Sequence, residues 1–247
     1  ANISIKSSAR EFAAAMPHDK VVLKQTNNSG GGHGVLCLTR KGDGYFYSDK
    51  NELIYGDYLR NFASDWNIQE LIEQHPFFAQ FSKTSLNTIR LYIYRSVVNE
   101  EIFIYSASLR IGHNGSFVDN LSQGGGFVKI DIVTGKLIGK IYDEEGFEYE
   151  SINDVDFSRE YIIPQWDKII ALSKSIARQI RHCHMVALDL CIDNENRIRM
   201  IEHNIGDNSY WWSHFMQIQP FGDKIQEVIN FCIEQKKYDP RFRYVKL

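Results

Sequence analysis

A glycine-rich loop near residue 30 separates two short apolar segments, and neither segment has the periodicity of a helix. Residues 21–25 are β-branched at their start, and residues 35–39 resume an apolar pattern soon after the loop. In mononucleotide- and dinucleotide-binding motifs a helix follows the glycine loop. The order strand, glycine loop, strand therefore excludes both motifs and predicts a hairpin-like sheet.

The rest of the chain mixes extended and helical segments. We expect helices at residues 8–15, 51–62, 164–181 and 224–235, and further strands at residues 45–48, 67–72, 87–98, 101–110, 117–120, 126–133, 185–192 and 197–202. The two longest strands follow one another across a short turn, which favours antiparallel pairing. The expected fold class is α+β, with mostly antiparallel sheets.

The composition argues against several classes of function. A net charge of −3, with no run of basic residues, provides no strong field for nucleic acid or a membrane surface. No apolar stretch reaches the ~18 residues of a transmembrane helix. The four cysteines form no CxxC pair, so a zinc ribbon is not expected, and we interpret them as reduced thiols of a cytoplasmic protein.

A hairpin around residues 193–196 carries the residues most typical of a metal site. Strand alternation places Asp189 on the face opposite its leucine neighbours, and Glu202 and Asn204 share a face because they are two residues apart. Pairing around the turn would bring Asp189 near Glu202. Hard cations such as Mg²⁺ prefer oxygen ligands of this kind. The alternative is a surface hairpin with solvated polar side chains.

Lys24 ends the first apolar strand just before the glycine loop. Glycines let a backbone approach phosphates closely, and the N–H groups of such a loop form an anion-binding nest. A lysine ammonium is a compact charge that suits a phosphate. The candidate phosphate-binding residues are Lys24, Ser29, Gly30, Gly31, Gly32 and Gly34. The alternative is a strand-end lysine in solvent beside a flexible turn.

The order of these features resembles the ATP-grasp superfamily. The resemblance rests on Val-Val-Leu-Lys24, on the loop at residues 29–34, and on Asp189 followed 13 residues later by Glu202-x-Asn204. Segments of the chain also resemble one branch, the sugar-transfer-associated ATP-grasp proteins. These segments are residues 85–90, 109–112, 118–125 and 130–135.

The resemblance implies two lobes that grip ATP between them, a smaller one at residues 1–68 and a larger one at residues 69–247. It implies one or two Mg²⁺ ions at Asp189, Glu202 and Asn204, with the phosphates held by Lys24 and the glycine loop. The implied adenine-binding segment is Gln69, Glu70, Leu71 and Ile72, with the backbone of Glu70 and Ile72 bonding the base edge. The alternative for this segment is a buried strand.

Two arginines complete the expected site. Arg90 faces away from its aliphatic neighbours, and Arg110 ends an apolar strand. The resemblance places arginines near the transferred phosphate or the acyl-phosphate, where a guanidinium group stabilises developing charge. The alternative for each is a salt bridge with an acidic residue. Asp119 and Asn120, beside a glycine run, either shape an acceptor site or form a local turn.

Two departures from the family pattern bear on the substrate. Many relatives carry an arginine two residues before the first metal aspartate, where this chain has Ala187, so Arg90 or Arg110 is a candidate substitute. The chain begins just before the lysine strand, so we expect the usual N-terminal domain of ATP-grasp enzymes to be absent. That domain often helps to form the acceptor pocket.

The resemblance implies an ATP-dependent carboxylate–amine ligase that works through an acyl-phosphate. Its partners would be a small-molecule or sugar-linked carboxylate and an amine such as an amino acid, in the modification of a polysaccharide or its precursors. Two alternatives are open. One is a small-molecule kinase on the same scaffold, and the other is a nucleotide-binding domain without turnover.

Overall fold

The structure is a computed structural model that describes residues 8–25, 34–48, 51–54, 66–119, 121, 124–206, 209–210 and 212–238. The chain divides into two compact units, Ala1–Glu73 and Gln74–Leu247. The division falls a few residues beyond the boundary expected after residue 68, because the strand Trp66–Glu70 pairs within the first unit.

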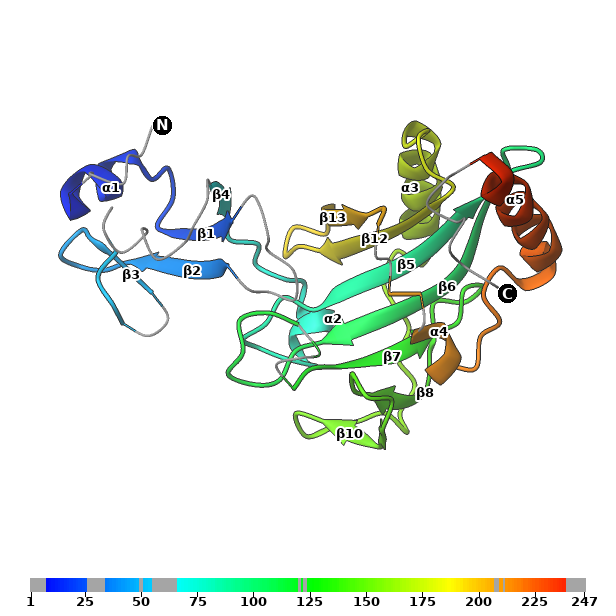
Figure 1. Cartoon of the computed structure of the whole chain (residues 1–247). Coiled ribbons are helices and arrows are strands. Elements are labelled where there is room, and N and C mark those ends of the chain that lie inside the picture. Colours follow the sequence, from blue (N-terminus) through cyan, green and yellow to red (C-terminus); the bar gives the residue numbers. More distant parts are fainter. Residues whose placement is uncertain are drawn as a thin grey trace. The chain divides into compact units, whose positions relative to one another are not determined.

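In its described residues, the first unit contains a four-stranded antiparallel sheet and the helix α1 (Figure 1). Its elements are α1 (Ala9–Ala15), β1 (Lys20–Gln25), β2 (Val35–Arg40), β3 (Phe46–Ser48) and β4 (Trp66–Glu70). The strand order is β3-β2-β1-β4, so β1 is bonded on both sides. Helix α1 begins at the expected place, because Ser8 and Glu11 form a capping box. Phe12 of α1 and Leu23 and Leu38 of the sheet form the core of this unit.

The second unit is built on a seven-stranded sheet in the order β13-β12-β5-β6-β7-β8-β9, and every neighbouring pair is antiparallel. A separate pair, β10-β11, is also antiparallel. The elements are α2 (Pro76–Ala79), β5 (Thr88–Arg95), β6 (Ile102–Ile111), β7 (Gly126–Ile130), β8 (Leu137–Tyr142), β9 (Glu148–Tyr149), β10 (Ser151–Ile152), β11 (Val155–Asp156), α3 (Trp166–Gln179), β12 (Met185–Ile192), β13 (Ile198–Asn204), α4 (Trp212–Phe215), the 3₁₀ helix η3 (Gly222–Lys224) and α5 (Ile225–Tyr238).

The large sheet has two faces with different chemistry. On one face aliphatic side chains such as Leu91, Leu109 and Leu188 pack against α3. On the other face aromatic side chains and the guanidinium groups of Arg90 and Arg110 meet Trp212 of α4. Figure 1 labels α3 and α4, which cover these opposite faces. All residues of β5 are buried as a result, including the arginine and tyrosines that alternate with its aliphatic residues.

The expected α+β class with mostly antiparallel sheets is confirmed. The described part of the chain contains no helix that is long and apolar enough to cross a membrane.

Two expected elements differ from the structure. The strand expected at residues 117–120 is wrong for 117–119, because the Ser116 side chain bonds the Val118 backbone and holds a bend there. The helix expected at 51–62 is not formed at 51–54, where Asn51 has a φ of 66° and Leu53 bridges to Tyr47. Residues 55–62 lie outside the described residues.

Candidate active site

The candidate site lies on the polar face of the seven-stranded sheet. In the ladder between β12 and β13, Asp189 is directly opposite Glu202, and Ala187 is opposite Asn204. In the ladder between β12 and β5, Asp189 is opposite Arg90. Residues that face one another across antiparallel strands project from the same side of a sheet. The three candidate metal ligands and Arg90 are therefore neighbours.

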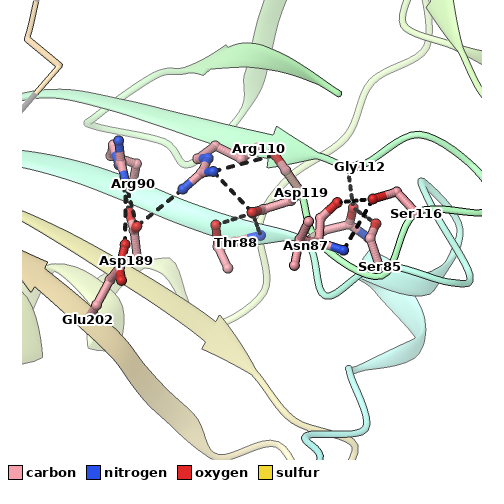
Figure 2. A network of polar contacts seen from close by, with 11 residues as sticks. Ser85, Asn87, Thr88, Arg90, Arg110, Gly112, Ser116, Asp119, Asp189 and Glu202 are labelled. Atoms are coloured by element: carbon pink, nitrogen blue, oxygen red, sulfur yellow. Dashed lines mark hydrogen bonds and ion pairs between the residues drawn. The ribbon is translucent and has the colours of Figure 1, made fainter. Parts of the chain in front are cut away.

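Asp189 is the centre of a buried charge network (Figure 2). Arg90 donates to both carboxylate oxygens, from Nε to Oδ1 at 2.7 Å and from Nη2 to Oδ2 at 2.6 Å. Arg110 donates from Nη1 to Oδ2 at 3.2 Å. The Asp189 side chain is only 2% exposed. The structure thus shows a salt bridge for both arginines, and their shared partner is a candidate metal ligand.

Arg110 has a second carboxylate partner, Asp119. Nη2 of Arg110 lies 3.1 Å from Oδ1 of Asp119. The other carboxylate oxygen accepts hydrogen bonds from the Thr88 hydroxyl and, at 3.1 Å, from the Thr88 backbone N–H. Figure 2 shows this chain of contacts running from Asp189 through Arg110 to Asp119 and Thr88. The polar contacts of Asp119 with Thr88 and Arg110 thus connect β5 and β6. Asn120 lies outside the described residues.

The indole ring of Trp212 lies over both arginines. The guanidinium carbons of Arg90 and Arg110 are 5.3 Å and 5.9 Å from its centroid. The ring also stacks on Phe127, with centroids 5.1 Å apart and planes 13° apart. A cation within about 6 Å of an indole face is attracted by the ring quadrupole. Trp212 therefore holds the guanidinium groups in place and covers them.

The network sets the protonation of the two opposed carboxyl groups. Burial raises the pKa of Asp189, but the hydrogen bonds from Arg90 and the charges of both arginines outweigh burial and hold that pKa below its ordinary value. Burial, and then the negative charge of Asp189, raises the pKa of Glu202 above its ordinary value. Two carboxylates on adjacent strands repel one another, so this place favours a cation or a proton.

The donor set suits a hard cation. Asp189 and Glu202 supply carboxylate oxygens and Asn204 an amide oxygen, which is the chemistry that Mg²⁺ prefers. The Glu202 side chain is 51% exposed and accessible from solvent. The described residues contain no group of three or more His, Cys, Asp or Glu that could hold a metal. Asn204 is the third candidate donor that the sequence predicted. An ion would have to share Asp189 with the arginines or take it from them.

Lys24 lies on β1, opposite Asn67 of β4. Gln69 is opposite Val22, so Gln69 shares a face of the small sheet with Lys24, whereas Glu70 points to the other face. The expected nucleotide-binding residues of β4 are therefore split between two faces. A role for Glu70 through its backbone groups does not depend on the direction of its side chain.

Part of the expected phosphate loop lies outside the described residues. Gly34 is described, has a φ of +75°, and accepts a hydrogen bond from the Gln25 backbone at 2.9 Å. A Cβ at Gly34 would lie 2.6 Å from Gln25 Oε1, so this end of the loop requires glycine. Leu71 and Ile72 follow β4 without regular structure. The loop residues outside the described part are Ser29, Gly30, Gly31 and Gly32.

The comparison with protein families decides the assignment. The model of the family described as sugar-transfer associated ATP-grasp matches residues 2–218. The chain belongs to this family. The resemblance in the sequence is thereby confirmed.

No curated protein matches this ATP-grasp chain. Among solved structures, the ADP complex of an N5-carboxyaminoimidazole ribonucleotide synthetase is similar, with 14% sequence identity and a TM-score of 0.46. The match covers 84% of this chain and 41% of the synthetase, so the chain spans less than half of that protein's length.

A second polar network of the ATP-grasp chain lies around Asn87. A structural role for this residue was not predicted from the sequence. The Asn87 amide donates to Gln74 at 3.0 Å and to the Phe78 carbonyl at 2.9 Å, and its oxygen accepts from the Gly112 backbone at 3.3 Å. A Cβ at Gly112 would lie 2.3 Å from Ser85 Oγ and 2.8 Å from the Val118 carbonyl. The segments at 85–90 and 109–112 are therefore held together by Asn87 next to the arginines. In the sequence, these two segments were notable only because they resemble segments of the family.

Proposed function

We propose that this ATP-grasp chain is an ATP-dependent carboxylate–amine ligase. The observation that carries the proposal is the buried pairing of Arg90 and Arg110 with Asp189, directly opposite Glu202. Such a group of carboxylates and guanidinium groups can bind a metal–polyphosphate complex, because carboxylates bind the metal and guanidinium groups bind phosphate oxygens. Family membership favours ATP as the polyphosphate.

Further contacts with the nucleotide are proposed for residues of the first unit. Lys24 would bind an α- or β-phosphate, and residues 29–34 would close over the phosphates. The backbone of Glu70 and Ile72 would bond the adenine edge. The shared sheet face of Lys24 and Gln69 supports a contact of Gln69 with the same nucleotide.

The arginines take the place of a missing family residue. The position two residues before Asp189 is Ala187, which lies opposite Tyr92 of β5. Arg90 and Arg110 approach Asp189 from the neighbouring strands β5 and β6. Both could therefore supply the positive charge that many relatives in the superfamily place at the position of Ala187.

The proposed reaction has two steps. A substrate carboxylate oxygen attacks the γ-phosphorus of ATP, the bond to the β–γ bridging oxygen breaks, and ADP leaves. An amine then attacks the acyl carbon, inorganic phosphate leaves, and the nitrogen loses a proton. Mg²⁺ bound at Asp189, Glu202 and Asn204 would neutralise phosphate charge and align the γ-phosphoryl group. Arg90 and Arg110 would orient that group and stabilise its developing charge, which is most of what phosphoryl transfer requires.

The proposed substrates are a sugar-linked carboxylate, such as a uronic acid, and an amino acid. This choice is supported by the family's association with sugar transfer. Product analysis tests it directly. Phosphate release that requires both a carboxylate and an amine, with an amide as product, supports the ligase. A stable phosphorylated product that forms without an amine would indicate a kinase instead, and ATP binding without turnover across the acceptor panel would indicate a binding domain.

Two variants test the metal assignment. We expect Asp189→Asn and Glu202→Gln each to lower Mg²⁺-dependent ATP turnover by roughly 100-fold, because each removes a charge that holds the metal–phosphate complex. Glu195→Gln is the matched control, since Glu195 lies on the turn of the same hairpin and pairs with Arg197 at 2.6 Å. If both site variants bind ATP with the same Mg²⁺ dependence as the unaltered protein, the assignment is wrong.

A further inference from the structure

Arg90 and Arg110 differ in the carboxylate partners that each would retain if a cation bound to Asp189. Arg90 makes two short contacts with Asp189, and its next carboxylate neighbour is Glu202 at 3.9 Å. Both of these carboxylates are candidate metal ligands. Arg110 makes one contact with Asp189 and another, at 3.1 Å, with Asp119. A cation bound to Asp189 and Glu202 would therefore take both carboxylate partners of Arg90. Arg110 would keep its contact with Asp119.

We propose that Asp119 is a positioning residue that keeps Arg110 beside Asp189 when Mg²⁺-ATP is bound, so that Arg110 contacts the terminal phosphate. The inference rests on the proposed function, because it requires Mg²⁺-ATP at Asp189. Asp119 itself touches neither the metal nor the nucleotide. It acts through the guanidinium group of Arg110.

The placement of Asp119 does not depend on Arg110 alone. Its two oxygens have separate partners: Oδ1 lies beside Arg110, and Oδ2 accepts from the backbone and the hydroxyl of Thr88. Thr88 is directly opposite Arg110 in the ladder between β5 and β6. The sheet therefore fixes Asp119 and Arg110 together, whatever happens at Asp189. Asp119 is 8% exposed, so water competes little for this pairing.

The planar geometry of the guanidinium group determines what the Arg110 nitrogen that is released from Asp189 would bind. Nη2 stays on Asp119, while Nη1, which lies 3.2 Å from Asp189, would be freed as the cation takes that carboxylate. A guanidinium edge held at one side presents its other donors in a fixed direction, which suits a phosphate oxygen. The Trp212 ring, 5.9 Å from the guanidinium carbon, limits tilting of the fork.

A double-mutant cycle tests this role. Binding of Mg²⁺ with a non-hydrolysable ATP analogue that has an imido β–γ bridge is measured by calorimetry for Arg110→Gln, Asp119→Asn and the double variant. We expect each single variant to bind about tenfold more weakly, and the double variant no more weakly than Arg110→Gln, because both changes remove one interaction. Binding of Mg²⁺-ADP, which lacks the terminal phosphate, should change less than about twofold.

Thr88 provides a matched pair that is less disruptive than the loss of a buried charge. Thr88→Val removes the hydroxyl at nearly constant shape and should weaken binding of the ATP analogue by about threefold. Thr88→Ser keeps the hydroxyl and should restore the affinity. Thermal melting of each variant confirms that the folded protein is being measured.

Three outcomes are informative. Losses that add in the double variant would show that Asp119 acts independently of Arg110, and equal losses for Mg²⁺-ADP would show an effect on the fold in general. Either result would overturn the inference. If Asp189→Asn abolishes binding while Asp119→Asn binds normally, the inference alone fails. If the unaltered protein binds no Mg²⁺-ATP analogue, the proposed function fails and the inference falls with it.

Discussion

Asp189 has an observed role as the partner of two arginines and a proposed role as a metal ligand, and the two roles compete. In the structure it neutralises two buried guanidinium groups, and its side chain is only 2% exposed. As a metal ligand it would have to release at least part of these contacts. Breaking a buried ion pair by removing one partner is costly because the other charge remains buried without compensation. The stability of the ligand-free protein should therefore depend strongly on this carboxylate.

We predict that Asp189→Asn lowers the free energy of unfolding of the ligand-free protein by roughly 3 kcal/mol. The amide keeps the shape of the side chain but leaves Arg90 and Arg110 without their shared negative charge. Urea unfolding in the presence of a chelator measures the effect. Glu195→Gln, a surface change on the same hairpin, should stay within about 0.5 kcal/mol. Equal stability of the two variants would mean that the charge network contributes little.

Single residues of this network could be predicted only in part. Alternation within one hairpin was enough to bring Asp189 to Glu202, and the register confirms it. The partners of the arginines were left open, because Arg90 lies 99 residues from Asp189 along the chain. Thr88 gave no signal of its own, since a threonine in an apolar strand is ordinary. Its role follows only from the position of Asp119.

At the scale of elements, the hairpin of β12 and β13 is closed by a turn that depends on one carboxylate. Oδ1 of Asp193 accepts from the backbone of Glu195 at 3.0 Å and of Arg197 at 2.9 Å. Oδ2 accepts from Nε of Arg197 at 2.7 Å and from Nε of Arg199 at 2.8 Å. Burial raises the pKa of Asp193, but these hydrogen bonds outweigh burial and hold the pKa well below its ordinary value.

We predict that Asp193→Asn costs about 2 kcal/mol of unfolding free energy at pH 7. Because the folded pKa lies below the unfolded one, the contribution of the carboxylate is complete above about pH 4 and is lost as the pH falls through the lowered folded value. The difference between Asp193→Asn and the unaltered protein should therefore shrink between about pH 4 and pH 2. Thermal melting across this range is the measurement. A difference that is constant with pH would contradict the role given to the charge.

Most elements could be predicted from periodicity and turn residues. The helix at Trp166–Gln179 and the two strands β12 and β13 lie within a few residues of the expected positions. The segment at 117–119 could not, because its apolar start resembles a strand whereas side-chain hydrogen bonds from Ser116 decide its shape. Local side-chain bonds of this kind compete with ladder formation and leave little trace in a hydrophobic pattern.

At the scale of the whole molecule, the proposed site depends on the order of the strands. The order β13-β12-β5-β6 places the β12–β13 hairpin beside two strands that come about 100 residues earlier, which brings Glu202, Asp189, Arg90 and Arg110 to one face. No local pattern contains this order, and the family resemblance indicated only that the arginines lie near the transferred phosphate. Lys24 belongs to the first unit and Asp189 to the second.

The most direct test is a crystal structure of the protein with Mn²⁺ and the imido analogue of ATP, with the metal located by its anomalous signal. We predict a Mn²⁺ ion bound by Asp189, Glu202, Asn204 and phosphate oxygens, with Arg110 on the terminal phosphate and still paired with Asp119. Arg90 should have left at least one oxygen of Asp189. A nucleotide bound with its metal away from this hairpin, and with Arg90 still on both oxygens of Asp189, would contradict the account.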